Sequence, residues 1–207
     1  MMIENNPNLS PRAFTIEMSV NFEHLLNVII AQLLGVKNED TKSFGNSSQA
    51  LSFNTKANLL LDLNYLNKEQ RVKFQIFIEI RNKFAHLHSV DTYEKCFEQT
   101  NNYSQLKKLF RIDEEGDSLE KDMEYMFIVL SLEIAMILKK INEKIISEMA
   151  IKYTQRRFTE AIKIKRKEYN SQYPENAKAI DDFIKFIKDD LIIEVDKKVK
   201  DKVPPHV

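Results

Sequence analysis

The chain has 207 residues, of which 43% are hydrophobic and 30% are charged, so it can bury one large core. Its 31 basic and 31 acidic residues give a formal net charge of zero, which excludes a protein-wide positive field that would attract nucleic acid. The three glycines and five prolines are too few for a many-stranded sandwich or barrel, so composition predicts an all-helical fold with few connections.

The N-terminal part is predicted to be an arm, then a helix, then a loop. Residues 1–13 contain two prolines and are expected to form a flexible N-terminal arm. Apolar residues at helical spacing predict a helix over about Phe14–Leu34, with Gly35 as its stop. Residues 36–52 are rich in serine, asparagine, aspartate and glycine, and this composition indicates a loop.

Two capped helices are predicted next. Ser52 or Asn54 can cap a short helix that continues through Leu63. Asn67 begins another helix, over about Lys68–Leu87, because its spacing to a glutamine three residues later allows a capping box. Along this second helix an apolar stripe at three- and four-residue steps predicts the side that faces the core. Its members are Phe77, Ile80, Phe84 and Leu87.

The second half of the chain reads as helix almost throughout. Shorter helical pieces are expected over 91–110, and the acidic stretch 113–117 is expected to be a turn. A long helix should begin at Ser118, reach at least Ser147 and end before Pro174. A last helix is predicted over about 177–200.

The same residues indicate where the protein resides. A single cysteine, Cys96, excludes an intrachain disulfide and is typical of a reducing compartment; we interpret it as a buried hydrophobic residue. Residues 1–10 are polar and lack the apolar segment of a signal peptide. The most apolar stretch, Met126–Leu138, is too short to span a bilayer. We therefore expect a soluble, cytoplasmic protein that has no membrane partner.

Three polar residues near the end of the predicted 68–87 helix can carry chemistry, namely Arg81, Asn82 and His86. Asn82 and His86 are four residues apart, so they share one side of the helix, and Glu79 lies near the same line. Arg81 is rotated by about 100° from Asn82, but its long side chain can bring the guanidinium back towards the imidazole.

These three groups match the requirements of RNA cleavage without a metal. A histidine can take the proton of a ribose 2′-hydroxyl or protonate the leaving oxygen, and an arginine can bind the scissile phosphate. Acid and base are both needed, and His88 lies on another side, so a symmetric dimer would have to supply the second His86. The competing interpretation is structural, because cations are common at helix C-termini, and spacing alone favours it.

A family resemblance changes that balance. The run Ile78–His86 resembles the signature of the HEPN superfamily, which is an arginine, a polar residue and then a histidine four to six places after the arginine. Upstream, Leu51–Leu63 resembles the segment that precedes this motif in mannitol-operon-repressor-like members. The resemblance covers about residues 14–100.

The resemblance implies a HEPN-like antiparallel helical bundle, which we assign to residues 14–150, followed by a helical C-terminal extension over 151–207. It also implies a homodimer whose motif faces the dimer cleft. We expect no cofactor, and no metal because the sequence has no cysteine pair and no His-x-x-x-His spacing that would hold one. Many members are metal-independent endoribonucleases of toxin–antitoxin or defence systems, which would make Arg81 and His86 the catalytic pair and Asn82 the polar residue beside the arginine. Other members are non-catalytic regulatory or protein-interaction modules, so an antitoxin or regulatory protein is an alternative partner to RNA.

A basic stretch in the predicted extension is a second candidate site. Between residues 152 and 167 the only acid is Glu160, and Tyr153, Phe158 and Tyr169 are interleaved with the basic residues. Such a patch can bind RNA phosphates and stack bases, although a solvated helix face is the favoured interpretation. The candidate RNA contacts are Lys152, Arg156, Arg157, Lys163 and Arg166.

Overall fold

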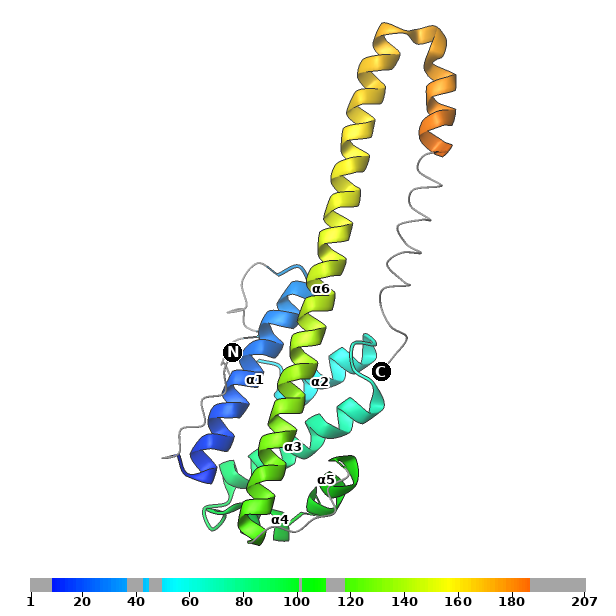
Figure 1. The fold of residues 1–207 in the computed structure, drawn as a ribbon. Coiled ribbons are helices and arrows are strands. Elements are labelled where there is room, and N and C mark those ends of the chain that lie inside the picture. The colour runs from blue at the N-terminus through cyan, green and yellow to red at the C-terminus, as the bar shows by residue number, and fades with distance from the viewer. Residues whose placement is uncertain (1–8, 37–42, 45–49, 101, 111–117, 187–207) are drawn as a thin grey trace. The chain divides into compact units, whose positions relative to one another are not determined.

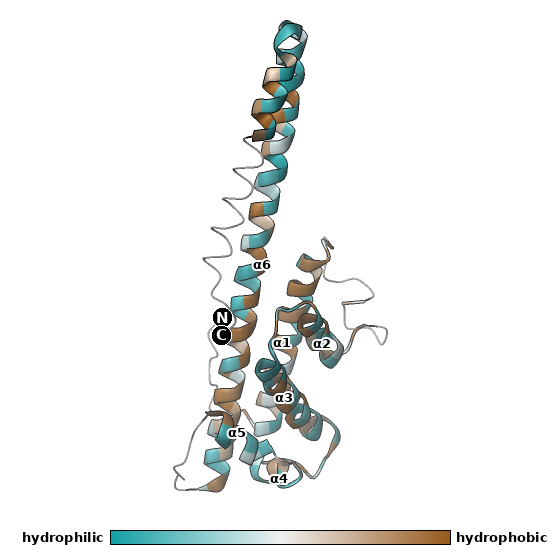
Figure 2. Cartoon of the chain, turned by 90° about the vertical axis from the view of Figure 1, so that its right-hand side faces the viewer, coloured by the Kyte–Doolittle hydropathy of each residue, from teal (hydrophilic) through white to brown (hydrophobic). Residues whose placement is uncertain are grey.

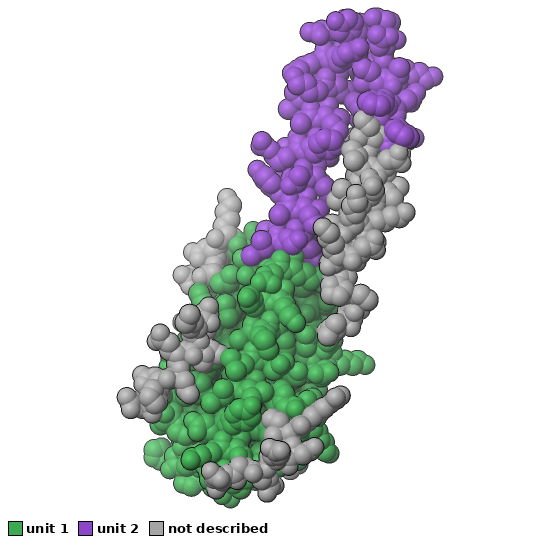
Figure 3. All heavy atoms as spheres, viewed as in Figure 1, with its two compact units in different colours: residues 1–145 green, residues 146–207 purple. Residues whose placement is uncertain are grey.

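The computed structural model describes residues 9–36, 43–44, 50–100, 102–110 and 118–186. All regular secondary structure in these ranges is helical, which confirms the predicted all-α class (Figure 1). The chain divides into two compact units, residues 1–145 and 146–207, which Figure 3 shows in different colours. No helix in the described ranges has a segment long and apolar enough to cross a membrane.

Helix α1 (Pro11–Leu33) begins earlier than its apolar periodicity predicts. The side chain of Ser10 accepts a hydrogen bond from the backbone N–H of Ala13 at 3.3 Å, and Pro11 occupies the first helical position. These two local signals add the last residues of the predicted arm to the helix. At the other end, Gly35 follows with a φ of 66°, a left-handed conformation that favours glycine after a helix.

Helices α2 (Phe53–Asp62) and α3 (Lys68–His86) form where capping residues predict them. Ser52, rather than Asn54, caps α2 by accepting from the N–H of Thr55 at 3.1 Å. The capping box of α3 is confirmed, because Asn67 Oδ1 accepts from the N–H of Gln70 at 2.8 Å and the Gln70 side chain accepts in return at 2.9 Å.

Two short helices, α4 (Tyr93–Glu98) and α5 (Asn102–Phe110), occupy the predicted 91–110 region. The carboxylate of Glu120 accepts hydrogen bonds from the N–H groups of Tyr93 at 2.8 Å and Glu94 at 2.6 Å. It therefore satisfies two N–H groups of the first turn of α4, and the Thr92 hydroxyl accepts from a third, that of Lys95, at 3.2 Å. The predicted acidic turn over 113–117 lies outside the described residues.

Helix α6 (Leu119–Gln172) is 54 residues long and confirms the predicted long helix. Pro174 begins a short 3-10 turn, Pro174–Asn176, and residues 177–186 are helical; the rest of the predicted last helix lies outside the described residues. In Figure 2 the first half of α6 carries more hydrophobic positions than the second half. That first half belongs to the unit of residues 1–145 and to its core.

The core of this unit is built around stacked aromatic rings. Phe77 of α3 lies 5.1 Å, ring centre to ring centre, from Phe22 of α1 and 5.6 Å from Phe127 of α6. Three members of the predicted apolar stripe, Phe77, Ile80 and Phe84, are at most 1% exposed and face the core. The fourth, Leu87, follows the last residue of α3 and packs on the core partly buried. Burying these side chains fixes the rotation of α3, and that rotation decides which residues face solvent.

Candidate functional site

The predicted motif lies in the last two turns of α3. Asn82 and His86 are exposed, and Arg81 is half-buried. Arg81 Nη1 donates a hydrogen bond to Asn82 Oδ1 at 3.0 Å, so the guanidinium is drawn to the side of the helix that carries Asn82. Among the described residues, none forms a hydrogen bond with the His86 side chain. The guanidinium of Arg81, which was predicted to turn back towards His86, therefore bonds Asn82 in this structure.

The motif belongs to a longer polar stripe along α3. Gln75, Glu79, Asn82 and His86 follow one another at steps of four, three and four residues, and all four are exposed. An α-helix turns by about 100° per residue, so these positions fall within about 60° of one another. The opposite side of α3 carries the buried stripe, which leaves the polar stripe open to solvent.

Arg12 holds the backbone that follows the motif, and sequence reasoning did not identify it. Its guanidinium donates to four carbonyl oxygens at the end of α3: from Nη1 to Phe84, and from Nη2 to Leu87 at 2.9 Å, His88 at 3.2 Å and Val90 at 2.7 Å. The last carbonyls of a helix lack partners within it, and a planar guanidinium can bind several at once. The Arg12 side chain thus fixes the turn that begins directly after His86.

No spacing rule could have identified this contact. Arg12 and Phe84 are 72 positions apart, and they meet only because the first turn of α1 packs beside the last turn of α3. The available signal was the pair Ser10-Pro11, which is typical of a helix start. That pair would have placed Arg12 on an ordered helix.

Two buried residues of α4, Cys96 and Tyr93, pack against α3. Cys96 is buried, and its Sγ lies 3.9 Å from the carbonyl oxygen of Ile80. Burial raises the pKa of the Cys96 thiol to about 12, so it stays protonated at neutral pH and is a poor nucleophile. The interpretation of Cys96 as a buried hydrophobic residue is confirmed. Tyr93 packs edge-on against Phe84 with ring centres 5.4 Å apart, beneath the motif.

An open pocket of about 440 Å³ adjoins the motif. Four residues of α3 and two of α5 line it: Val72, Gln75, Ile76, Glu79, Asn102 and Gln105. The buried amide of Asn102 donates from Nδ2 to Glu79 Oε2 at 3.1 Å, which fixes one oxygen of that carboxylate. The exposed lining of the pocket is therefore mainly amide and carboxylate groups, and Val72 is its main apolar side chain.

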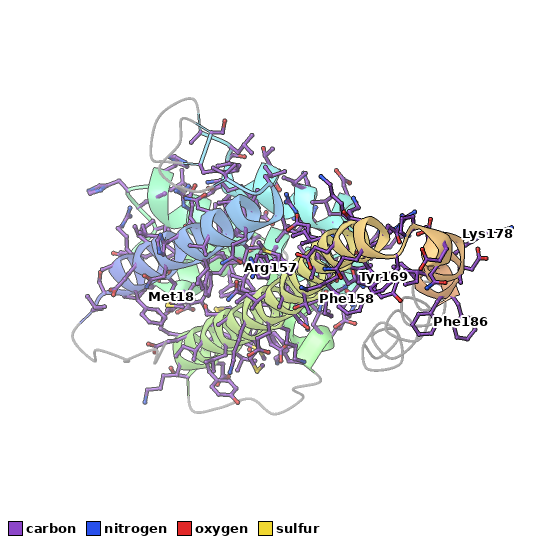
Figure 4. The ribbon with its side chains drawn as sticks, turned by 90° about the horizontal axis from the view of Figure 1, so that it is seen from above. Met18, Arg157, Phe158, Tyr169, Lys178 and Phe186 are labelled. Carbon is purple, nitrogen blue, oxygen red and sulfur yellow. The ribbon has the colours of Figure 1, made fainter. Side chains whose placement is uncertain are left out.

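The predicted basic residues lie in the other unit, on the second half of α6. All five are exposed: Lys152, Arg156, Arg157, Lys163 and Arg166. Figure 4 shows Arg157, Phe158 and Tyr169 on this part of the helix. Arg156 Nε pairs with Glu160 at 3.1 Å, and Arg166 pairs with Asp181 of the 177–186 helix. These two arginines are therefore already partly neutralised, which weakens the patch as a phosphate site.

Metal ligands do not gather in the described part of the chain, where no three histidine, cysteine or acidic side chains are placed to hold an ion. Comparisons with protein-family models, curated proteins and solved structures find no match to this chain. The chemistry of the α3 stripe and its neighbouring pocket is therefore the basis for assigning a function.

Proposed function

We propose that this protein is a HEPN-like, metal-independent endoribonuclease that acts as a homodimer in a toxin or defence setting. The observation that supports this proposal is the exposed end of α3. There His86 and Asn82 share one side of the helix, and Asn82 holds the guanidinium of Arg81 at 3.0 Å. The exposed imidazole of His86 lies about one helical turn from Asn82, which orients the guanidinium of Arg81, so the end of α3 carries both a proton-transfer group and a phosphate-binding group.

The reaction uses the substrate's own nucleophile. His86 takes the proton of a ribose 2′-hydroxyl, and the resulting oxygen attacks the adjacent phosphorus. Arg81 binds the phosphate oxygens and stabilises the charge that develops on them. The bond from phosphorus to the 5′-oxygen breaks, and that oxygen takes a proton, leaving a 2′,3′-cyclic phosphate and a 5′-hydroxyl. DNA lacks the 2′-hydroxyl and should not be cleaved.

A second copy of the chain supplies the general acid in this proposal. One His86 cannot serve as base and acid in the same step, and a two-fold axis would bring a second His86 to the same phosphate. An exposed apolar stripe on the first half of α6 supports self-association. Tyr125, Leu132 and Met136 are 57%, 44% and 50% exposed, at steps of seven and four residues. Exposed large apolar side chains in a row are typical of interaction surfaces.

The competing function is a non-catalytic regulatory or protein-interaction module. The α3 stripe would then receive a partner protein, such as an antitoxin or a regulatory protein. The contact between Arg81 and Asn82 favours this alternative, because it already uses one hydrogen-bond donor of the guanidinium without any ligand. The basic residues of α6 would then be a solvated helix surface.

A cleavage assay in EDTA distinguishes the two functions. We expect the wild-type chain to cut single-stranded or structured RNA without metal, and Arg81→Ala and His86→Ala to lose activity by a factor of about 10² or more. His24→Ala is the matched control, because His24 is also an exposed helical histidine and lies outside the stripe. Equal cleavage by all four proteins would indicate contamination. An inactive wild type across several RNAs would favour the interaction module.

A further inference from the structure

We propose that the pocket between α3 and α5 binds one nucleobase of the RNA substrate and selects guanine. This inference rests on the proposed ribonuclease function and adds a base preference to it. Glu79 is the residue that would determine the preference, and Asn102 would position it.

The location of the pocket fits a subsite next to the scissile phosphate. Gln75 and Glu79 line it, and both belong to the exposed α3 stripe that continues to Asn82 and His86. Glu79 precedes His86 by seven residues, which corresponds to about 10 Å along the helix axis at 1.5 Å per residue. A nucleotide adjoining the one at His86 can span that separation. A single strand lying along α3 would therefore place a neighbouring base in the pocket.

The lining of the pocket suits a flat heterocycle better than an ion or an apolar ligand. Ile76 is 2% exposed and Val72 is 38% exposed, so the apolar surface that the face of a base can contact is mainly the Val72 side chain. Gln75, Glu79, Asn102 and Gln105 provide amide donors, amide acceptors and carboxylate acceptors around it. Unstacked bases in single-stranded RNA are recognised through hydrogen bonds to their edges, and these are the groups that form them.

The carboxylate of Glu79 decides between the bases. An ionised carboxylate only accepts hydrogen bonds, and it has two oxygens that can accept side by side. The Watson–Crick edge of guanine offers two adjacent donors, N1–H and the N2 amino group. Adenine, cytosine and uracil each present only one donor next to an acceptor on that edge. A bidentate contact with Glu79 is therefore available to guanine alone.

Asn102 prepares this contact before any ligand arrives. Asn102 is 3% exposed, and its Nδ2 donates to Glu79 Oε2 at 3.1 Å. This bond restricts the Glu79 side chain to one orientation, and each carboxylate oxygen can still accept a further hydrogen bond. A group held in place by a buried partner loses less conformational freedom on binding.

The test measures binding of RNA that cannot be cleaved. Four labelled 2′-O-methyl hexanucleotides, identical except for G, A, C or U at one central position, are titrated with the full-length protein, and Kd is measured by fluorescence anisotropy. We expect the guanine oligonucleotide to bind about tenfold more tightly than the others, since one good bidentate contact discriminates by about that factor. Glu79→Gln should abolish the preference, because an amide offers one acceptor and one donor.

Glu98→Gln is the matched control, since Glu98 is an exposed glutamate of α4 that does not line the pocket, and it should keep the preference. Circular dichroism shows whether each variant remains folded. Equal affinity for all four oligonucleotides, no binding to any of them, or a guanine preference that survives in Glu79→Gln would overturn the proposal. The cleavage assay in EDTA is read separately. Cleavage without a base preference would contradict only the guanine subsite. A guanine preference without cleavage would contradict only the ribonuclease function.

Discussion

The guanidinium of Arg12 contributes to the candidate site without lying in the polar stripe of α3. It binds the carbonyl oxygens of Leu87, His88 and Val90 as well as that of Phe84, and so holds the chain as it leaves the motif helix. A side chain of this kind positions a site by holding the backbone, so its loss should increase local opening of that backbone.

Replacing Arg12 with methionine should loosen this turn. Arg12→Met keeps the apolar stem but removes every donor, so four carbonyl oxygens lose their bond to Arg12, and only that of Leu87 keeps a second donor, the N–H of Val90 at 3.1 Å, among the bonds of the described residues. We expect the free energy of unfolding to fall by about 1–3 kcal/mol. Amide hydrogen exchange at residues 87–90 should also become faster. Arg157→Met, at an exposed arginine of α6, is the control and should change neither measurement. Unaltered hydrogen exchange at residues 87–90 in Arg12→Met would show that Arg12 does not stabilise this turn.

The buried Cys96 thiol and Tyr93 phenol make the free energy of unfolding depend on pH in the alkaline range. Burial raises the pKa of Cys96 to about 12 from an ordinary value of 9.0, and it also raises the pKa of Tyr93. Both groups bind protons more tightly in the folded state. Their contribution is therefore complete below the unfolded pKa and is lost as the pH rises through the folded one.

We expect the free energy of unfolding to decline as the pH is raised above about 9, and to decline less steeply in Cys96→Ala. Urea denaturation at pH 8, 9 and 10 measures both slopes. The comparison is made between slopes, because removing a buried sulfur also lowers stability at every pH. Identical slopes for the two proteins would show that Cys96 is not the group responsible.

At the level of elements, an ion pair joins α1 to α2. Lys56 Nζ lies 2.8 Å from Glu23 Oε1; the lysine side chain is 0% exposed, whereas that of the glutamate is 31% exposed. This pair gives Lys56 a structural role. A buried charge is tolerated only when a partner compensates it.

The two ends of this pair should respond unequally to substitution. Glu23→Gln leaves a fully buried ammonium without an acid, so we expect a loss of about 2–4 kcal/mol in the free energy of unfolding. Lys56→Met leaves a carboxylate that solvent can still reach, so its cost should be about 1 kcal/mol or less. Chemical denaturation of both variants gives the comparison. A costlier Lys56→Met would mean that the pair stabilises mainly through packing of the lysine stem.

Local signals explain which elements were predictable. The caps at Ser52 and Asn67 act over three residues, so the starts of α2 and α3 follow from the sequence. The apolar stripe of α3 likewise predicts its own buried side, and with it the exposure of Asn82 and His86. The predicted start of α1 at Phe14 is wrong, because Ser10 caps the helix and Pro11 occupies its first position.

Contacts between distant segments explain what was missed. The bond between Asn102 and Glu79 joins residues 23 positions apart, and the contacts of Arg12 span 72 positions or more. Such pairings depend on how α1, α3 and α5 pack, and no periodicity in one helix encodes them. The polar stripe could be predicted because the periodicity of α3 alone sets it. The pocket could not be predicted because it depends on how α3 and α5 pack together.

At the level of the whole molecule, the proposed function requires two copies of the chain. The apolar stripe of Tyr125, Leu132 and Met136 is exposed in a single chain, and burying it against a second copy would remove it from water. Leu132→Glu adds a charge at its centre, and an unpaired charge is costly to bury in an interface.

We therefore expect the wild-type chain to be a dimer and Leu132→Glu to shift it towards monomer, as measured by light scattering after size exclusion. Cleavage per chain should fall together with the dimer fraction, because each site would need two His86 side chains. Val20→Glu is the control, since Val20 is 62% exposed on α1 and lies outside the stripe. A wild-type protein that is monomeric yet active would contradict the composite site.

The contacts of Arg12 have a practical consequence for anyone who shortens this protein. The apolar repeat of the first helix starts at Phe14, and a chain trimmed to that residue would keep every described side chain of the hydrophobic core. Such a chain could pass the usual checks of expression, helicity and cooperative melting. It would nevertheless lack the guanidinium that secures the turn after His86. An inactive trimmed protein would then be mistaken for evidence against catalysis, so activity is best judged on the chain that retains residues 10–13.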